Sequence, residues 1–144
     1  MNKWVQHFRE SAEHIATRSK DTNTKVGAVI FDELHGVEVS SGWNCLPRGV
    51  THTTERNKAP LKYKLTSHAE ISAITNSARM GRATYGKSVV VTMFPCSLCC
   101  AALINAGISR VYSPPPDFNH LKYGEDMKLS VDMFKEAGII VTEI

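Results

Sequence analysis

Two short motifs carry side chains that bind transition metals. The first is His68-Ala69-Glu70 and the second is Pro95-Cys96-Ser97-Leu98-Cys99. Each motif stands where a strand or loop is predicted to enter the first turn of a helix. Cysteines at positions i and i+3 of such a turn project from one face, so both sulfurs can reach the same ion. The helix N-terminus also favours negative charge, which helps to keep both sulfurs as thiolates.

One imidazole and two thiolates would form a zinc site with an open coordination position. His68, Cys96 and Cys99 would be the protein ligands, and water would take the fourth tetrahedral position, as in catalytic zinc sites. Zinc lowers the pKa of such a water from about 15.7 towards about 7, so that hydroxide becomes available near neutral pH. Glu70 stands two positions beyond His68, where its carboxylate could move protons among the water, a ring nitrogen and a departing amine.

Either motif alone has less specific interpretations. A lone His-Ala-Glu would usually contain a surface or capping histidine, and a lone Cys-x-x-Cys could be a redox pair or half of a structural zinc site. The two motifs together favour a catalytic zinc, because each opens a predicted helix and Pro95 precedes the first cysteine. In combination they resemble the signature of zinc-dependent nucleobase deaminases.

Composition predicts a globular protein that binds a small ligand. The chain has 144 residues, of which 42% are hydrophobic and 22% charged, and we expect one domain covering residues 1–144. A formal net charge of +3 is too small for holding a polymeric nucleic acid. No apolar run approaches the roughly 20 residues that cross a bilayer, and the first residues lack the pattern of a secretory signal. We therefore expect a cytoplasmic protein without membrane contacts, in which clustered cysteines indicate metal binding rather than disulfides.

The apolar pattern predicts alternating helices and strands. The predicted helices cover residues 4–18, 67–80, 97–106 and 125–137, and the predicted strands cover residues 26–31, 37–43, 88–93, 108–112 and 139–142. The first two strands form a hairpin, and the helix-connected strands of the second half run parallel. The sequence therefore predicts an α/β fold in which a mixed five-stranded sheet lies between layers of helices. Residues 44–66 are expected to form a long loop.

Similarity to a known family extends beyond the metal motifs. The stretches that carry it are residues 18–28 (RSKDTNTKVGA), 42–44 (GWN), 46–49 (LPRG), 68–70 (HAE), 94–99 (FPCSLC) and 106–108 (AGI). In these stretches the chain resembles the deoxycytidylate deaminases of the cytidine deaminase superfamily. Phe94 supports this branch, because branches acting on tRNA adenosine, guanine or a riboflavin precursor usually have glutamate there.

The resemblance implies a fold, a reaction and partners. The fold would be a three-layer α/β/α cytidine-deaminase-like fold. The reaction would be the hydrolytic deamination of deoxycytidylate (dCMP) to deoxyuridylate (dUMP) and ammonia, which supplies a thymidylate precursor. Relatives assemble as dimers, tetramers or hexamers, so a homo-oligomer is expected. Many relatives are activated by dCTP and inhibited by dTTP, and Mg²⁺ would accompany such a triphosphate effector.

The resemblance also implies roles for individual residues. It implies that His68, Cys96 and Cys99 bind one catalytic Zn²⁺ and that Glu70 is the proton shuttle. It further implies that Asn44 contacts the sugar or base and that the main chain at Ala69 holds the base carbonyl. Asn23 is an expected contact in the loop beneath the substrate.

The long loop offers cations for the phosphate of a nucleotide. They are Arg48, Arg56, Lys58, Lys62 and Lys64, with Tyr63 available for stacking. Guanidinium groups bind phosphate through paired hydrogen bonds. We favour Arg48 and Lys62, and the alternative for each is a solvated charge on a surface loop.

Two positions depart from the family pattern. Ser72 stands where many relatives have asparagine in His-Ala-Glu-x-Asn, and Cys45 follows Asn44 where many have glycine. The shorter Ser72 side chain predicts a changed base or phosphate preference, and Cys45 leaves regulation by dCTP and dTTP open. The segment Pro114–Lys122 either covers the substrate or is a proline-stiffened connection, and no spacing recommends a role for His120.

Three other functions are compatible with parts of this sequence. The nearest is deamination of another free nucleotide or base, such as dCTP, a modified cytosine nucleotide or a purine, and Ser72 is its best support. A zinc-stabilised nucleic-acid-binding module is a different class, and the weak basic charge and missing aromatic-basic stripe count against it. A redox protein has only the Cys-x-x-Cys motif in its support.

Overall fold

The centre of the molecule is one five-stranded sheet with the strand order β2-β1-β3-β4-β5. The computed structural model describes residues 2–144. The strands are β1 (Gly27–Asp32), β2 (Val37–Trp43), β3 (Ser88–Val91), β4 (Arg110–Ser113) and β5 (Ile140–Glu143). β1 pairs antiparallel with both β2 and β3, whereas β3, β4 and β5 run parallel. The prediction of a mixed five-stranded sheet is confirmed.

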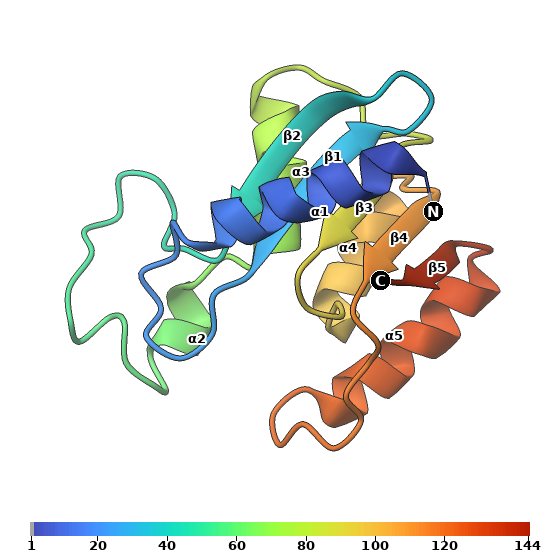
Figure 1. Cartoon of the computed structure of the whole chain (residues 1–144). Coiled ribbons are helices and arrows are strands. Elements are labelled where there is room, and N and C mark those ends of the chain that lie inside the picture. Colours follow the sequence, from blue (N-terminus) through green and yellow to red (C-terminus); the bar gives the residue numbers. More distant parts are fainter. Residues whose placement is uncertain (1) are drawn as a thin grey trace.

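Helices cover both faces of this sheet (Figure 1). α1 (Lys3–Ala16) packs on one face, where its apolar side contacts Val29 and Phe31 of β1. α3 (Ala69–Arg79), α4 (Ser97–Asn105) and α5 (Gly124–Glu136) share a second apolar cluster with Ala28 and Ile30. Successive side chains of β1 thus alternate between the two clusters, as in a strand buried on both faces. The expected three-layer α/β/α fold is confirmed.

The predicted long loop contains structure that the sequence pattern did not show. α2 (Lys62–Leu65) is a single helical turn within it, and one turn is too short to display a helical period. Cys45 and Ser67, near the two ends of the loop, form an isolated antiparallel bridge, with N–H···O distances of 3.0 and 2.8 Å. The two ends of the loop are therefore held together directly before His68.

The strands of the one sheet come from residues 27 to 143. This arrangement supports the single domain expected for residues 1–144, which stays a prediction. Among residues 2–144, no helix combines the length and apolar character needed to span a membrane.

Gly42 sets the distance between β2 and α3. A Cβ atom at this position would lie 2.6 Å from the carbonyl oxygen of Ala69 and would also meet the backbone nitrogen of Ala73. No side chain fits there unless the helix backbone moves. Because α3 begins at Ala69, the close approach at Gly42 positions the helix end next to His68 and Glu70.

We predict that Gly42→Ala destabilises the protein, because the added methyl group overlaps the α3 backbone. Overpacking of this kind costs about 1–3 kcal/mol. Chemical denaturation followed by circular dichroism measures the change in the free energy of unfolding. Glu38→Ala, at an exposed position of the same strand, is the control. Equal stability of the two variants would contradict the close approach of β2 and α3.

Candidate active site

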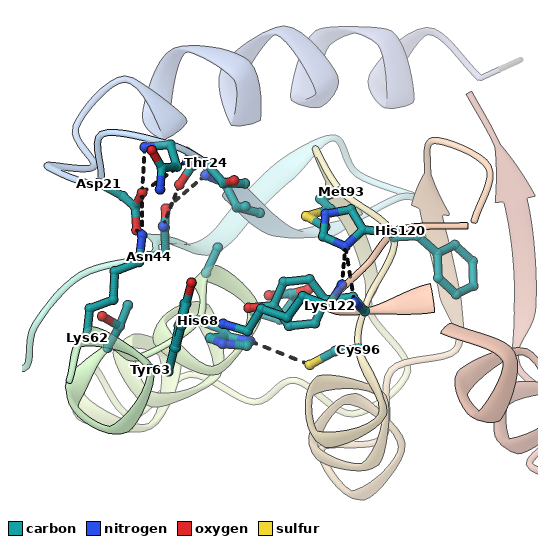
Figure 2. Close-up of a pocket in the computed structure, with 17 residues that line it drawn as sticks. Asp21, Thr24, Asn44, Lys62, Tyr63, His68, Met93, Cys96, His120 and Lys122 are labelled. Atoms are coloured by element: carbon teal, nitrogen blue, oxygen red, sulfur yellow. Dashed lines mark hydrogen bonds and ion pairs between the residues drawn. The ribbon is translucent and has the colours of Figure 1, made fainter. Parts of the chain in front are cut away.

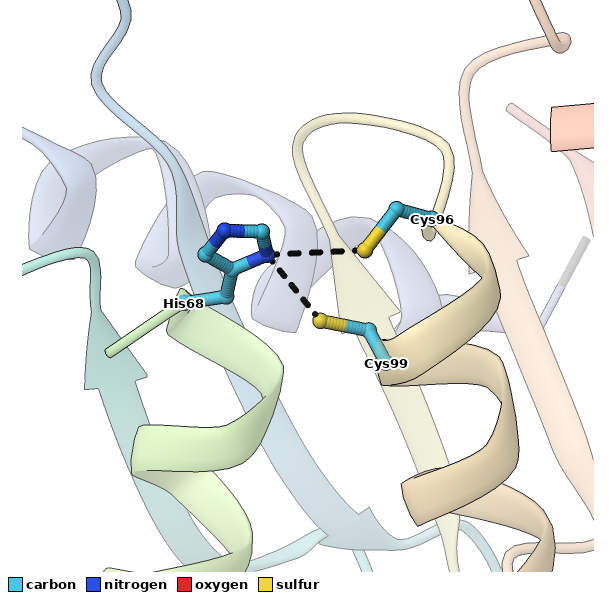
Figure 3. Close-up of side chains that lie close together, drawn as sticks. All are labelled: His68, Cys96 and Cys99. Carbon is cyan, nitrogen blue, oxygen red and sulfur yellow. Dashed lines mark hydrogen bonds between the residues drawn. The ribbon is translucent and has the colours of Figure 1, made fainter. Parts of the chain in front are cut away.

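Two helix N-termini bring the predicted metal ligands together. His68 immediately precedes α3 and Cys96 immediately precedes α4, and both have an extended backbone with ψ of 157° and 170°. Cys99 lies in the first turn of α4. Figure 3 shows the His68 ring facing the sulfurs of both cysteines. The two motifs, about 30 residues apart in the chain, thus meet at one point.

The distances among the three side chains fit a tetrahedral zinc ion. His68 Nδ1 lies 3.5 Å from Cys96 Sγ and 3.3 Å from Cys99 Sγ. Zinc bonds of about 2.0 Å to nitrogen and about 2.3 Å to sulfur, at tetrahedral angles, separate the two ligand atoms by about 3.5 Å. Among residues 2–144, this is the one group of three or more histidine, cysteine or acidic side chains close enough to hold a metal ion.

The ionisation of the two thiols also favours a bound cation. Hydrogen bonds with Cys99 and His68 lower the pKa of the Cys96 thiol to about 4. The same bond to Cys96, together with burial, raises the pKa of the Cys99 thiol. The bond between the two sulfurs thus shifts their pKa values in opposite directions, because two adjacent thiolates would repel each other. A divalent cation would stabilise both sulfurs as thiolates, since it offsets their repulsion and their loss of hydration.

Glu70 lies in the first turn of α3 and is 4% exposed. Burial raises the pKa of its carboxyl group, and the negative charge of Cys96 adds to this rise. A carboxyl group with a raised pKa can both accept and donate a proton during catalysis. The position of Glu70 beside the metal ligands therefore suits the proton-shuttle role expected for it.

A pocket of about 230 Å³ opens beside the metal ligands (Figure 2). This volume lies somewhat below the range of roughly 300–1,000 Å³ that is typical of sites for small molecules. Four parts of the chain far apart in sequence form its wall together with Asn44. Its lining residues are Asp21, Asn23, Thr24, Val26, Asn44, Lys62, Tyr63, Thr66, His68, Ala69, Glu70, Met93, Phe94, Cys96, His120, Lys122 and Tyr123.

Five of the six expected substrate contacts line this pocket. They are Asn23, Asn44, Lys62, Tyr63 and Ala69. The Asn44 side chain also holds the pocket wall together, because it accepts a hydrogen bond from Val26 N (2.8 Å) and donates one to Thr24 O (2.9 Å). Its amide is thereby fixed in one orientation.

The structure corrects one expectation about the long loop and narrows a second, which stays a prediction. Arg48 is exposed and lies outside the pocket lining; its guanidinium donates to Asn76 Oδ1 on α3 at 2.7 Å. It is therefore withdrawn as a phosphate ligand of this pocket. Tyr63 was expected to offer its ring for stacking, but Lys122 Nζ lies 2.7 Å from the ring centroid, so one face is already covered.

The sequence left open whether the segment between β4 and α5 covers the substrate. His120, Lys122 and Tyr123 line the pocket, although no role was expected for His120. Its Nδ1 accepts hydrogen bonds from the backbone N–H groups of Lys122 and Tyr123 at 3.2 and 3.1 Å. The proline-rich start of this segment was a signal that the chain could cover the site here, and the structure supports that alternative.

The two departures from the family pattern lie next to each other outside the pocket lining. The Ser72 hydroxyl lies 3.0 Å from the Ser67 hydroxyl, and Ser67 pairs with Cys45 through the backbone. Both departures therefore contact the residue that precedes His68. Cys100, which follows the second sulfur ligand, is buried and contacts Ser130 O on α5 through its own sulfur.

Comparison with known proteins identifies the family. The model of the cytidine and deoxycytidylate deaminase zinc-binding region matches residues 2–113. The chain belongs to the cytidine and deoxycytidylate deaminase family. Within this family, it is 40% identical over 143 residues to an "uncharacterized deaminase in luxG 3'region" of Aliivibrio fischeri, covering 99% of this chain and 94% of that protein. The deoxycytidylate deaminase of Pongo abelii is 36% identical over 143 residues, covering 95% of this chain and 77% of that protein.

Solved structures of deaminases share this fold. The dCMP deaminase of cyanophage S-TIM5, in complex with dCMP and dUMP, matches with a TM-score of 0.78 and 22% identity. The match covers 100% of this chain and 99% of the cyanophage chain. At this identity the match establishes the common fold, while the family model and the curated relatives confirm the expected resemblance to deoxycytidylate deaminases.

We predict that Cys99→Ala weakens zinc binding by more than about 100-fold, since loss of a direct ligand should exceed the 10–100-fold typical of outer-shell partners. Zinc content after expression in zinc-supplemented medium, measured by elemental analysis, checks this. Cys100→Ala is the matched control, because it removes the adjacent buried sulfur that faces α5. Full zinc content in Cys99→Ala would contradict the assigned ligand set.

Proposed function

We propose that this protein is a zinc-dependent deaminase that hydrolyses dCMP to dUMP and ammonia and so supplies a thymidylate precursor. The observation that carries the proposal is the buried Glu70, which lines one pocket together with His68 and Cys96 of the ligand group His68, Cys96 and Cys99. Family membership supports the reaction class. The relatives named deoxycytidylate deaminase support the choice of substrate.

The proton transfers of this reaction are assigned to Glu70. When bound, zinc would supply the Lewis acidity that makes water a nucleophile near neutral pH. The oxygen adds to C4 of the cytosine ring, and Glu70 accepts the proton that this oxygen loses. Glu70 passes this proton to the ring nitrogen next to C4. It then accepts the second proton from the oxygen now bonded to C4 and passes it to the amine, and the C4–N bond breaks to release ammonia as the C4 carbonyl forms. Burial of Glu70 raises its pKa and so suits it to both directions of transfer.

The start of α3 also supplies a donor for the base. Ala69 is the first residue of the helix, and the first N–H groups of a helix have no intrahelical acceptor. The backbone N–H of Ala69 can therefore bind the base carbonyl from the pocket wall. Met93 and Phe94 supply apolar surface on the side of β3, against which an aromatic ring can pack.

The proposed function also includes the metal content, the assembly and the regulation of the protein. One catalytic zinc ion per chain and assembly as a homo-oligomer stay predictions. Regulation by dCTP and dTTP, with Mg²⁺ bound to the triphosphate, is also a prediction. Deamination of another free nucleotide or base is the alternative that a substrate panel would distinguish.

We expect the zinc-loaded protein to convert dCMP to dUMP with release of ammonia. Ultraviolet absorbance follows the loss of the cytosine chromophore, and chromatography identifies the product. The panel also contains deoxycytidine, CMP, dCTP and guanine. Absence of turnover for every cytosine nucleotide would reject the proposed function, and turnover of guanine alone would favour the purine alternative.

Glu70→Gln should yield a folded, zinc-loaded protein that is nearly inactive. The amide keeps the shape of the side chain but cannot accept the proton from water, and general acid-base groups contribute about 10²–10⁴-fold to rates. We would measure kcat for dCMP together with zinc content and circular dichroism. Glu125→Gln, a change of an exposed carboxylate at the start of α5, should retain wild-type kcat. Near-normal kcat in Glu70→Gln would remove Glu70 from the mechanism.

A further inference from the structure

Three charged side chains line the pocket in addition to Glu70 and the metal ligands. They are Asp21, Lys62 and Lys122 (Figure 2). Asp21 lies in the loop between α1 and β1, Lys62 begins α2, and Lys122 lies in the segment before α5. A cytosine base and its sugar need no ionic partner, whereas a phosphate group is recognised by cations. The part of the pocket lined by these three residues is called the outer pocket. Its charges bear on which part of a nucleotide it binds.

Lys62 already has a partner for its charge. Its Nζ lies 3.0 and 3.2 Å from the two carboxylate oxygens of Asp21, and the two side chains are only 7% and 12% exposed. Asp21 Oδ1 also accepts hydrogen bonds from the backbone N–H groups of Asn23 and Thr24 at 2.8 and 3.0 Å. Although burial opposes it, these bonds and the contact with Lys62 hold the pKa of Asp21 below its usual value. The pair is therefore ionised and neutral overall.

Lys122 lacks such a partner among residues 2–144, where no carboxylate lies within ion-pair distance of it. Its Nζ lies against two aromatic rings instead, 2.7 Å from the centroid of Tyr63 and 4.9 Å from that of Tyr123. Aromatic faces attract an ammonium group without neutralising it. Burial and the charge of Lys62 lower the pKa of Lys122, and the charges of Asp21 and Cys96 offset this only in part.

We propose that Lys122 binds the phosphate of the substrate and that Asp21, by neutralising Lys62, matches the pocket to a single phosphate group. The inference rests on the proposed deaminase function and names the substrate class as a pyrimidine nucleoside monophosphate. The two lysines and one aspartate leave a net charge of +1. A monophosphate finds one free ammonium group there, whereas the additional phosphates of a triphosphate would meet an ionised carboxylate without a second free cation.

Lys122→Gln should lower the selectivity for dCMP over deoxycytidine, expressed as the ratio of the two kcat/KM values. A hydrogen bond to a charged group contributes about 1.5–3 kcal/mol, so the ratio should fall about 10- to 100-fold. Lys122→Arg should retain most of the ratio. Arg48→Gln, a change of an exposed cation outside the pocket, should leave it unchanged. A ratio in Lys122→Gln equal to that of Arg48→Gln would overturn the assignment of Lys122.

Asp21→Asn should shift selectivity toward triphosphates. Asparagine keeps the Oδ1 acceptor for Asn23 and Thr24 but removes the charge that neutralises Lys62. The ratio of kcat/KM for dCTP over dCMP should rise at least about tenfold, the effect of one added charged contact. The double variant Asp21→Asn/Lys62→Gln restores the net charge of +1 and should show no rise. An unchanged ratio in folded Asp21→Asn would overturn the role of Asp21.

Lys62→Gln is a second test that can be used if Asp21→Asn does not fold. This variant leaves Asp21 without a counterion, so the ratio of kcat/KM for dCTP over dCMP should fall. A rise in this ratio would contradict the proposed role of Asp21. Failure of the inference is distinguishable from failure of the proposed function. A wild-type protein that deaminates no cytosine nucleotide rejects the function, whereas a wild-type protein that prefers dCTP to dCMP rejects only the inference.

Discussion

The active site depends on the meeting of two helix N-termini at one point. α3 and α4 start from different parts of the chain, yet their N-terminal ends must hold the His68 Nδ1 atom 3.3–3.5 Å from two sulfurs. The sheet fixes this arrangement, because Gly42 of β2 contacts the α3 backbone and β3 leads through Pro95 into α4. Burying two thiolates beside a carboxylate is unfavourable without a cation, because the like charges repel one another and lose hydration. The fold and metal binding are therefore expected to stabilise each other.

The chemistry was predictable from sequence because it is encoded over short distances. Spacings of two residues in His-x-Glu and three in Cys-x-x-Cys place side chains on one helical turn regardless of the rest of the fold. The sheet was predictable for a similar reason, since apolar runs such as residues 26–31 and 88–93 stand between turn-forming residues. α2 was missed because a single turn shows no period, and Arg48 was misplaced because nothing local indicates the direction of a loop side chain.

The outer pocket could not be predicted, because contacts between distant segments create it. Lys62 pairs with Asp21 across 41 positions, and Lys122, which lies in the segment before α5, contacts the ring of Tyr63. His120 showed no informative spacing, since its ring accepts backbone hydrogen bonds rather than acting within a side-chain motif. These tertiary contacts decide which lysine has a carboxylate partner and which does not. Composition cannot show this, because it gives only the number of lysines.

The pocket thus separates catalysis from recognition. At its buried end, two thiolates would cancel the charge of a divalent ion, so the metal site attracts no phosphate by its net charge. In the outer pocket, the Asp21–Lys62 ion pair and Lys122, which has no carboxylate partner among residues 2–144, are proposed to set how much negative charge is accepted. Ser72 and Cys45, the departures from the family pattern, contact Ser67 outside the pocket lining. Ser72 and Cys45 can therefore affect the substrate through the position of Ser67, the residue before His68. Substitutions in the outer pocket, in contrast, can change the preferred nucleotide without altering the metal ligands.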